Sequence, residues 1–169
     1  MKVRRLTAMA LLTAVALIIF TVEAQLPAPI PIPGIKLGLS NIVTVFALWL
    51  LGPAEAAMIL FARIFLGAVF AGNFSTVFYS LAGGSLAWVV TFLFCRFCKN
   101  QPIWIAGCLG AIAHAIGQMA AAILISGTAS LIIYLPVMIA CAIITGAFTG
   151  LCAQLLVKRG NKFWKISFK

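Results

Sequence analysis

The sequence contains no aspartate, and its two acidic residues are Glu23 and Glu55. Its single histidine is His114. Without aspartate there is no Asp-based catalytic triad, and there is no acidic cluster to hold Mg²⁺-diphosphate. One histidine excludes a zinc site built from several histidines, and no GxxxxGK(S/T) phosphate loop is present. We therefore expect no metal site, no cofactor and no catalytic residue, and we interpret the chain as a non-enzyme.

Charged residues are also scarce, at 8% of the 169 residues, whereas 64% are hydrophobic. Soluble domains carry about 25% charged residues, so this chain has too little polar surface for a soluble globule. Several apolar runs approach the roughly 20 residues that cross about 30 Å of hydrocarbon. The sequence predicts one all-α domain in the lipid bilayer, a bundle of six transmembrane helices. The predicted helices are 6–23, 37–51, 54–72, 74–95, 103–126 and 131–157.

The basic residues follow the ends of these runs. The chain has 12 Lys and Arg residues and a net charge of +10, and all the cations except Lys36 and Arg63 lie at predicted membrane ends. The positive-inside rule then places both termini in the cytoplasm, with residues 158–169 as a basic tail. We expect a multi-pass protein of a bacterial-type cell membrane. Nucleic acid is not an expected partner, because the cations lie at the membrane ends, where the positive-inside rule accounts for them.

The N-terminal segment and one pair of cysteines each have an alternative interpretation. The basic start, the apolar stretch and the small residues Val22 and Ala24 also resemble a cleaved signal peptide. Cys95 and Cys98 form a CxxC pair without a second pair. Thiols on the cytoplasmic side stay reduced, so we interpret the cysteines mainly as small apolar residues and keep a redox or metal role as the alternative.

The segment LPAPIPIPGIKLGLSN, residues 26–41, interrupts the helical pattern with alternating prolines. Proline removes an amide donor and disfavours helix in the residue before it, so this segment is predicted to be extended. It falls on the outer side, between the first two helices. Irregular backbone near lipid is tolerated where it covers protein or a cavity. We therefore predict that residues 24–36 form a lid over an outward-facing pocket, with Lys36 at its mouth.

Polar side chains within the apolar runs are the candidate ligand-binding groups. Arg63 lies halfway along its run, where a charge costs at least ~2.5 kcal/mol. Glu55 lies about 12 Å away along the same helix, too far for a direct pair. His114 and Gln118 share one helix face. The predicted ligand-binding residues are Lys36, Asn41, Arg63, Asn73, Tyr79, His114, Gln118 and Tyr134, and the expected ligand is small and anionic or amphipathic. As alternatives, Arg63 pairs with Glu23 or a carbonyl, and the tyrosines are interfacial belt residues.

Small residues four apart let helices approach closely in lipid. Ala10 and Ala14 form such a pair on the first helix, and Gly146 and Gly150 form another. We interpret such pairs mainly as packing within the bundle. For Ala10 and Ala14 we also consider docking onto another membrane subunit.

The stretches LPAPIPIPGIKLGLSNIVTVFAL, ARIFLGAVFAGNFSTVFYSLAGG, GAIAHAIGQMAAA and YLPVMIACAIITGAFTG resemble the Gx transporter family. This family is also called heptaprenyl diphosphate synthase component I, and the resemblance covers roughly residues 5–155. It implies similarity to the substrate-binding S components of energy-coupling-factor (ECF) transporters. Such components have six helices, a small-residue face on the first helix and an outward pocket, and they work with a membrane coupling subunit and two ATPases.

Two functions follow from these observations. The leading hypothesis is a substrate-capture subunit of an ATP-driven importer. The alternative is a non-catalytic accessory protein in polyprenyl diphosphate or menaquinone production, or in membrane electron transfer.

Overall fold

The computed structural model describes residues 3–25, 38–72, 74–98 and 101–163. Across these ranges the chain is helical and contains no strand. The elements are α1 (Val3–Gln25), α2 (Asn41–Leu50), α3 (Pro53–Ala71), α4 (Ser75–Phe97), α5 (Ile103–Ser126), the 3-10 helix η1 (Ala129–Tyr134) and α6 (Leu135–Phe163). The sequence predicts that the lid begins at residue 24, but α1 continues to Gln25. The rest of the predicted lid, with Lys36, and Asn73 lie outside the described residues.

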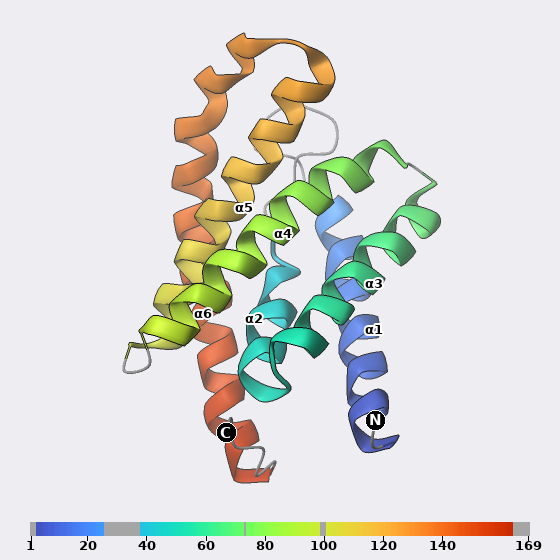
Figure 1. Ribbon diagram of the computed structural model, residues 1–169, viewed down its shortest axis with the longest axis vertical. Coiled ribbons are helices and arrows are strands. Elements are labelled where there is room, and N and C mark those ends of the chain that lie inside the picture. The colour runs from blue at the N-terminus through green and yellow to red at the C-terminus, as the bar shows by residue number, and fades with distance from the viewer. Residues whose placement is uncertain (1–2, 26–37, 73, 99–100, 164–169) are drawn as a thin grey trace.

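The helices form one bundle in which α2 is the short central element (Figure 1). The start of α1 and the end of α6 lie at the same end of the bundle, and the turn from α5 through η1 into α6 lies at the opposite end. Helices α1, α2 and α3 share an apolar core that includes Ala16, Ala47, Leu48 and Ile59, each no more than 2% exposed.

Helix α2 has 10 residues and therefore rises only about 15 Å. The sequence placed this helix at 37–51, but Gly38 has a φ of 79°, in the left-handed region. A helix cannot continue through a residue in that conformation. The chain makes a turn at residues 38–40 instead, and Asn41 begins the helix near the middle of the bundle. The polar turn is thereby brought into the interior.

The start of α6 has a similar local cause. The sequence extended this helix back to residue 131, across Pro136, but the α-helix begins at Leu135. A proline ring clashes with the carbonyl four residues earlier and supplies no amide donor. The preceding residues therefore form the separate 3-10 turn η1, and Pro136 occupies the first turn of α6, where its missing donor costs nothing.

Glycines allow α4, α5 and α6 to pack backbone against backbone. A Cβ atom built on Gly107 would lie 2.5 Å from the Gly150 Cα. A Cβ on Gly117 would lie 2.6 Å from the Ala82 carbonyl oxygen. Separations this short exclude any side chain, so α5 is fixed closely against both neighbours. Gly146 and Gly150 therefore pack inside the bundle.

Five of the helices are long and apolar enough to cross a membrane, and α2 is the shorter exception. The outward surface agrees with a lipid environment. Large apolar side chains such as Phe70, Leu124 and Ile133 are at least 75% exposed, which is unfavourable in water but suits hydrocarbon. The chain is an all-helical membrane protein.

Candidate functional site

The turn at residues 38–40 lies between two buried charges. Glu23, near the end of α1, is 4% exposed, and Arg63, in the middle of α3, is 3% exposed. The Gly38 amide donates to the Glu23 Oε1 atom at 2.5 Å. The Arg63 Nη1 atom donates to the Ser40 hydroxyl. One short turn thus partly satisfies an acid from α1 and a base from α3. We call Glu23, Arg63 and this turn the charged cluster.

Each charge also keeps unpaired atoms. The Arg63 Nε and Nη2 atoms and the Glu23 Oε2 atom are buried and have no hydrogen-bond partner in the described part of the chain. Glu23 attracts Arg63 electrostatically. Within the described ranges, however, Glu23 and Arg63 do not come within 4.0 Å of each other. The ion pair that meets this limit there joins Arg5 and Glu55, at 3.3 Å. The expected alternative of an Arg63–Glu23 pair therefore holds as a longer-range attraction rather than a direct contact.

His114 and Gln118 of α5 approach the charged cluster from the other side. His114 is 5% exposed and Gln118 is 1% exposed. A Cβ on Gly38 would lie 3.1 Å from the His114 Cδ2 atom, so the histidine ring packs directly on the turn. A backbone hydrogen bond to Gly83 of α4 holds the ring, which also lies within electrostatic range of Arg63. The His114 Nδ1 atom has no partner among the described residues.

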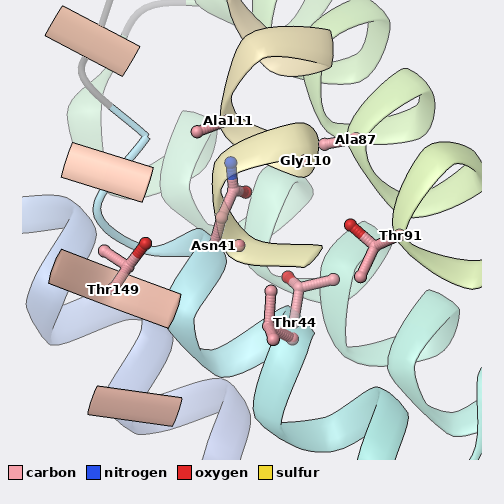
Figure 2. A pocket seen from close by; sticks show the side chains of 9 residues that line it. Asn41, Thr44, Ala87, Thr91, Gly110, Ala111 and Thr149 are labelled. Atoms are coloured by element: carbon pink, nitrogen blue, oxygen red, sulfur yellow. The ribbon is translucent and has the colours of Figure 1, made fainter. Parts of the chain in front are cut away.

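Asn41 connects the charged cluster to a small, mostly apolar pocket that three threonines also line (Figure 2). Its amide is 7% exposed, and neither its Nδ2 nor its Oδ1 atom has a partner in the described ranges. Figure 2 shows Asn41 and Thr44 of α2, Thr91 of α4 and Thr149 of α6 near Gly110 of α5. The space between them is enough for about one water molecule. A water there would supply the hydrogen bonds that Asn41 lacks.

The structure brings together four of the residues predicted to bind a ligand, namely Asn41, Arg63, His114 and Gln118, which lie in and around the charged cluster. Two others are described elsewhere on the bundle. Tyr79 packs against an apolar cluster that includes Met119 and Met138. Tyr134 lies on η1 and is 40% exposed. Lys36 and Asn73 lie outside the described residues.

Sequence reasoning did not single out Ser40, Thr44, Thr91 or Thr149. Ser40 and Gly38 become important only because the turn before α2 lies inside the bundle. Threonines in apolar helices commonly bond their own backbone, as Thr149 does with the Gly146 carbonyl at 3.3 Å. The usable signal was the pairing of glycine and serine directly before a short apolar run.

The sequence also raised the questions of a metal site, of the cysteines and of the Ala10/Ala14 face. No group of three or more His, Cys, Asp or Glu residues suited to a metal lies in the described ranges. All five cysteines are free thiols, including Cys95 and Cys98. Ala10 and Ala14 are both exposed on α1, whereas Ala8 and Ala16 are buried against the core. The Ala10/Ala14 face therefore points away from the bundle.

Comparison with known proteins gives one match. The model of a family described as heptaprenyl diphosphate synthase component I matches residues 12–156. No curated protein and no solved structure matches the chain. The match runs from α1 to α6 and contains every described residue of the charged cluster. The chain therefore belongs to the heptaprenyl diphosphate synthase component I family.

Proposed function

We propose that this protein is a non-catalytic, substrate-binding membrane subunit of an ATP-driven importer of the ECF type. One observation carries the proposal. Arg63 is buried at mid-bundle and keeps two donor atoms, Nε and Nη2, without a partner among the described residues. A buried charge is normally fully paired, because desolvation without compensation is very costly. A half-paired arginine at this depth is the mark of a binding site.

The two unpaired donors also indicate what they bind. Nε and one terminal nitrogen form one edge of the planar guanidinium, and this edge matches two oxygens of a carboxylate or phosphate. The other terminal nitrogen, Nη1, is held by Ser40, so the edge has a fixed direction. Asn41 and His114 pack on the same turn and supply neutral hydrogen-bonding groups. Lys36, Asn73, Tyr79 and Tyr134 remain proposed ligand contacts on the sequence argument alone.

Energy coupling would come from partner subunits. The chain has no phosphate loop of its own, so import requires ATPases reached through a membrane coupling subunit. Ala10 and Ala14 form an exposed small-residue face on α1, which suits close contact with another membrane helix. We propose cytoplasmic termini in a bacterial-type cell membrane, on the basis of the basic chain ends.

Native mass spectrometry of the protein purified in mild detergent tests the binding role. We expect a retained small molecule whose loss accompanies Arg63→Met. Purification from native membranes with associated proteins tests the transport role, and we expect ATPase activity to co-purify. Retention of no molecule by the wild type, together with no associated ATPase activity, would contradict both parts.

The family description favours a second candidate, a non-catalytic accessory subunit in polyprenyl diphosphate or menaquinone production, or in membrane electron transfer. A synthase component in the purified assembly, in place of an ATPase, would favour this candidate. Both functions agree with a protein that is not itself an enzyme.

A further inference from the structure

The buried acid and the buried base of the charged cluster are in the same state. Each has one atom engaged by the turn at residues 38–40 and at least one atom open. Glu23 uses Oε1 for the Gly38 amide and leaves Oε2 open. Arg63 uses Nη1 for the Ser40 hydroxyl and leaves Nε and Nη2 open. The open atoms are therefore one hydrogen-bond acceptor on a negatively charged group and two hydrogen-bond donors on a positively charged group.

The cluster is close to electrically neutral without a guest. Glu23 and Arg63 attract one another, and the other groups that pack on the turn, Asn41 and His114, are an amide and an imidazole. A simple anion bound to Arg63 would leave one uncompensated negative charge in a buried, low-dielectric site. Such a charge carries a heavy desolvation penalty. A guest with charges of both signs carries no net charge into the site.

We infer that the charged cluster binds a zwitterion, with an anionic group on the Arg63 Nε–Nη2 edge and a cationic hydrogen-bond donor on the Glu23 Oε2 atom. This inference rests on the proposed binding function and narrows its ligand class. A small amphipathic amino acid or amino phosphonate has the required groups. The guest completes both half-satisfied charges and does not displace the turn, because its contacts are the atoms that the turn leaves open.

The alternative is an internal ion pair that only stabilises the fold. In that case we would expect the carboxylate and guanidinium to meet directly, as Arg5 and Glu55 do at 3.3 Å. Instead, the two groups attract one another from more than 4.0 Å apart, and each forms a hydrogen bond with the same turn. The two opposite charges are not in direct contact, and each has an atom without a hydrogen-bond partner. Such an arrangement is suited to a guest that binds both groups.

Matched probes of equal carbon skeleton test the inference. Norleucine carries both groups, hexanoate only the carboxylate, and pentylamine only the amine. Phenylalanine, 3-phenylpropanoate and 2-phenylethylamine form a second set with a larger body, and glycine, acetate and methylamine a third. Binding is measured by the shift in melting temperature and by isothermal titration on the protein in detergent or nanodiscs. In at least one set we expect the zwitterion to bind ~10-fold or more tightly than either singly charged probe.

Charge variants give the sharper readout. Glu23→Gln keeps an acceptor for the Gly38 amide but removes the negative charge, so the preference should move towards the carboxylate-only probe. Arg63→Met should move it towards the amine-only probe. Glu23→Asp keeps the charge and should retain the zwitterion preference. A purely structural pair would change the melting temperature in these variants without changing which probe binds best.

The outcomes separate this inference from the function on which it rests. A carboxylate-only probe that binds the wild type as well as its zwitterion overturns the zwitterion inference and leaves the binding function standing. An unchanged probe preference in Glu23→Gln also overturns it. Binding of no probe from any set overturns the inference too. The binding function itself fails only if the purified protein also retains no small molecule.

Discussion

The Arg63 guanidinium donates a hydrogen bond to the Ser40 hydroxyl through Nη1, while its Nε and Nη2 atoms have no partner among the described residues. The bond joins α3 to the turn that precedes α2, across 23 positions of the chain. It positions the open edge of the guanidinium. The geometry thus assigns separate roles to the two sides of one side chain, one structural and one free for a ligand.

Substitutions at Arg63 separate these roles. Arg63→Lys keeps the charge but loses the two-nitrogen edge, so we expect a folded protein with weaker binding of the molecule that the wild type retains. Arg63→Met loses both, and it removes the positive charge that attracts the buried Glu23 carboxylate, so we also expect a lower free energy of unfolding. Retention by native mass spectrometry and melting temperature are measured for both. Wild-type retention in Arg63→Met would rule out a ligand role.

Ser40→Ala tests the structural side of Arg63. The substitution leaves the Nη1 atom buried without its hydroxyl partner, and an unsatisfied buried donor costs about 1–3 kcal/mol. We expect the melting temperature to fall by a matching amount. Ser40→Thr keeps the hydroxyl and serves as the matched control. Equal stability of Ser40→Ala and the wild type would show that this bond contributes nothing.

Gly38 is the most constrained position of the turn. Its φ of 79° is unfavourable for any residue with a Cβ atom and costs about 1–2 kcal/mol. An added Cβ would also lie 3.0 Å from the Asn41 Nδ2 atom and 3.1 Å from the His114 Cδ2 atom. We therefore expect Gly38→Ala to lower both stability and ligand retention.

Gly72→Ala is the matched control for Gly38→Ala. Gly72 has a φ of 62°, but no heavy atom lies within 4 Å of its Cβ position. Gly72→Ala therefore introduces backbone strain without a steric contact. The difference in unfolding free energy between the two variants then measures the cost of the contacts at the turn. Equal costs would show that His114 and Asn41 move aside without loss.

The glycines of α5 give a second matched pair. A Cβ on Gly107 meets the backbone of α6, at 2.5 Å from the Gly150 Cα, whereas a Cβ on Gly110 meets the Thr91 hydroxyl at 2.5 Å. A side chain can rotate away more easily than a backbone can. Overpacking in Gly110→Ala should cost about 1–3 kcal/mol of unfolding free energy. We expect a larger loss in Gly107→Ala.

The double variant Gly110→Ala/Thr91→Ala tests the assigned contact. Removing the threonine hydroxyl should recover part of the loss in Gly110→Ala, so the two costs will not add. Chemical unfolding in one detergent measures all the variants. Strict additivity would contradict a direct contact between Gly110 and Thr91.

The sequence predicts the helical membrane bundle well, because long apolar runs have few other structures open to them. It also identifies Arg63 and His114, since ionisable groups inside apolar runs are costly and need a reason. It does not reveal Ser40 or the second role of Glu23. Their meaning depends on where the turn before α2 lies, and that position is set by packing of three helices rather than by any local pattern.

The prediction placed the starts of α2 and α6 too early, for different reasons. Pro136 lies within an apolar run, and its effect on the helix start is local, so the error at α6 was avoidable from the sequence. Gly38 is harder, because a glycine can either continue a helix or adopt the left-handed conformation. The choice at Gly38 follows from the Glu23 carboxylate that accepts its amide, a contact between residues 15 positions apart.

Ala14 and Ala16 give the test of the partner-docking face on α1. Ala14 is exposed, whereas Ala16, two positions later, is 1% exposed and packs in the core. Leucine at Ala14 adds bulk only on the outward face, so Ala14→Leu should keep the melting temperature and the retained ligand of the wild type. It should abolish the co-purifying ATPase activity, since close helix contact in lipid requires small residues. Ala16→Leu instead overpacks the core, with an expected loss of about 1–3 kcal/mol of unfolding free energy. Undiminished ATPase activity in Ala14→Leu preparations would show that this face meets lipid rather than a partner subunit.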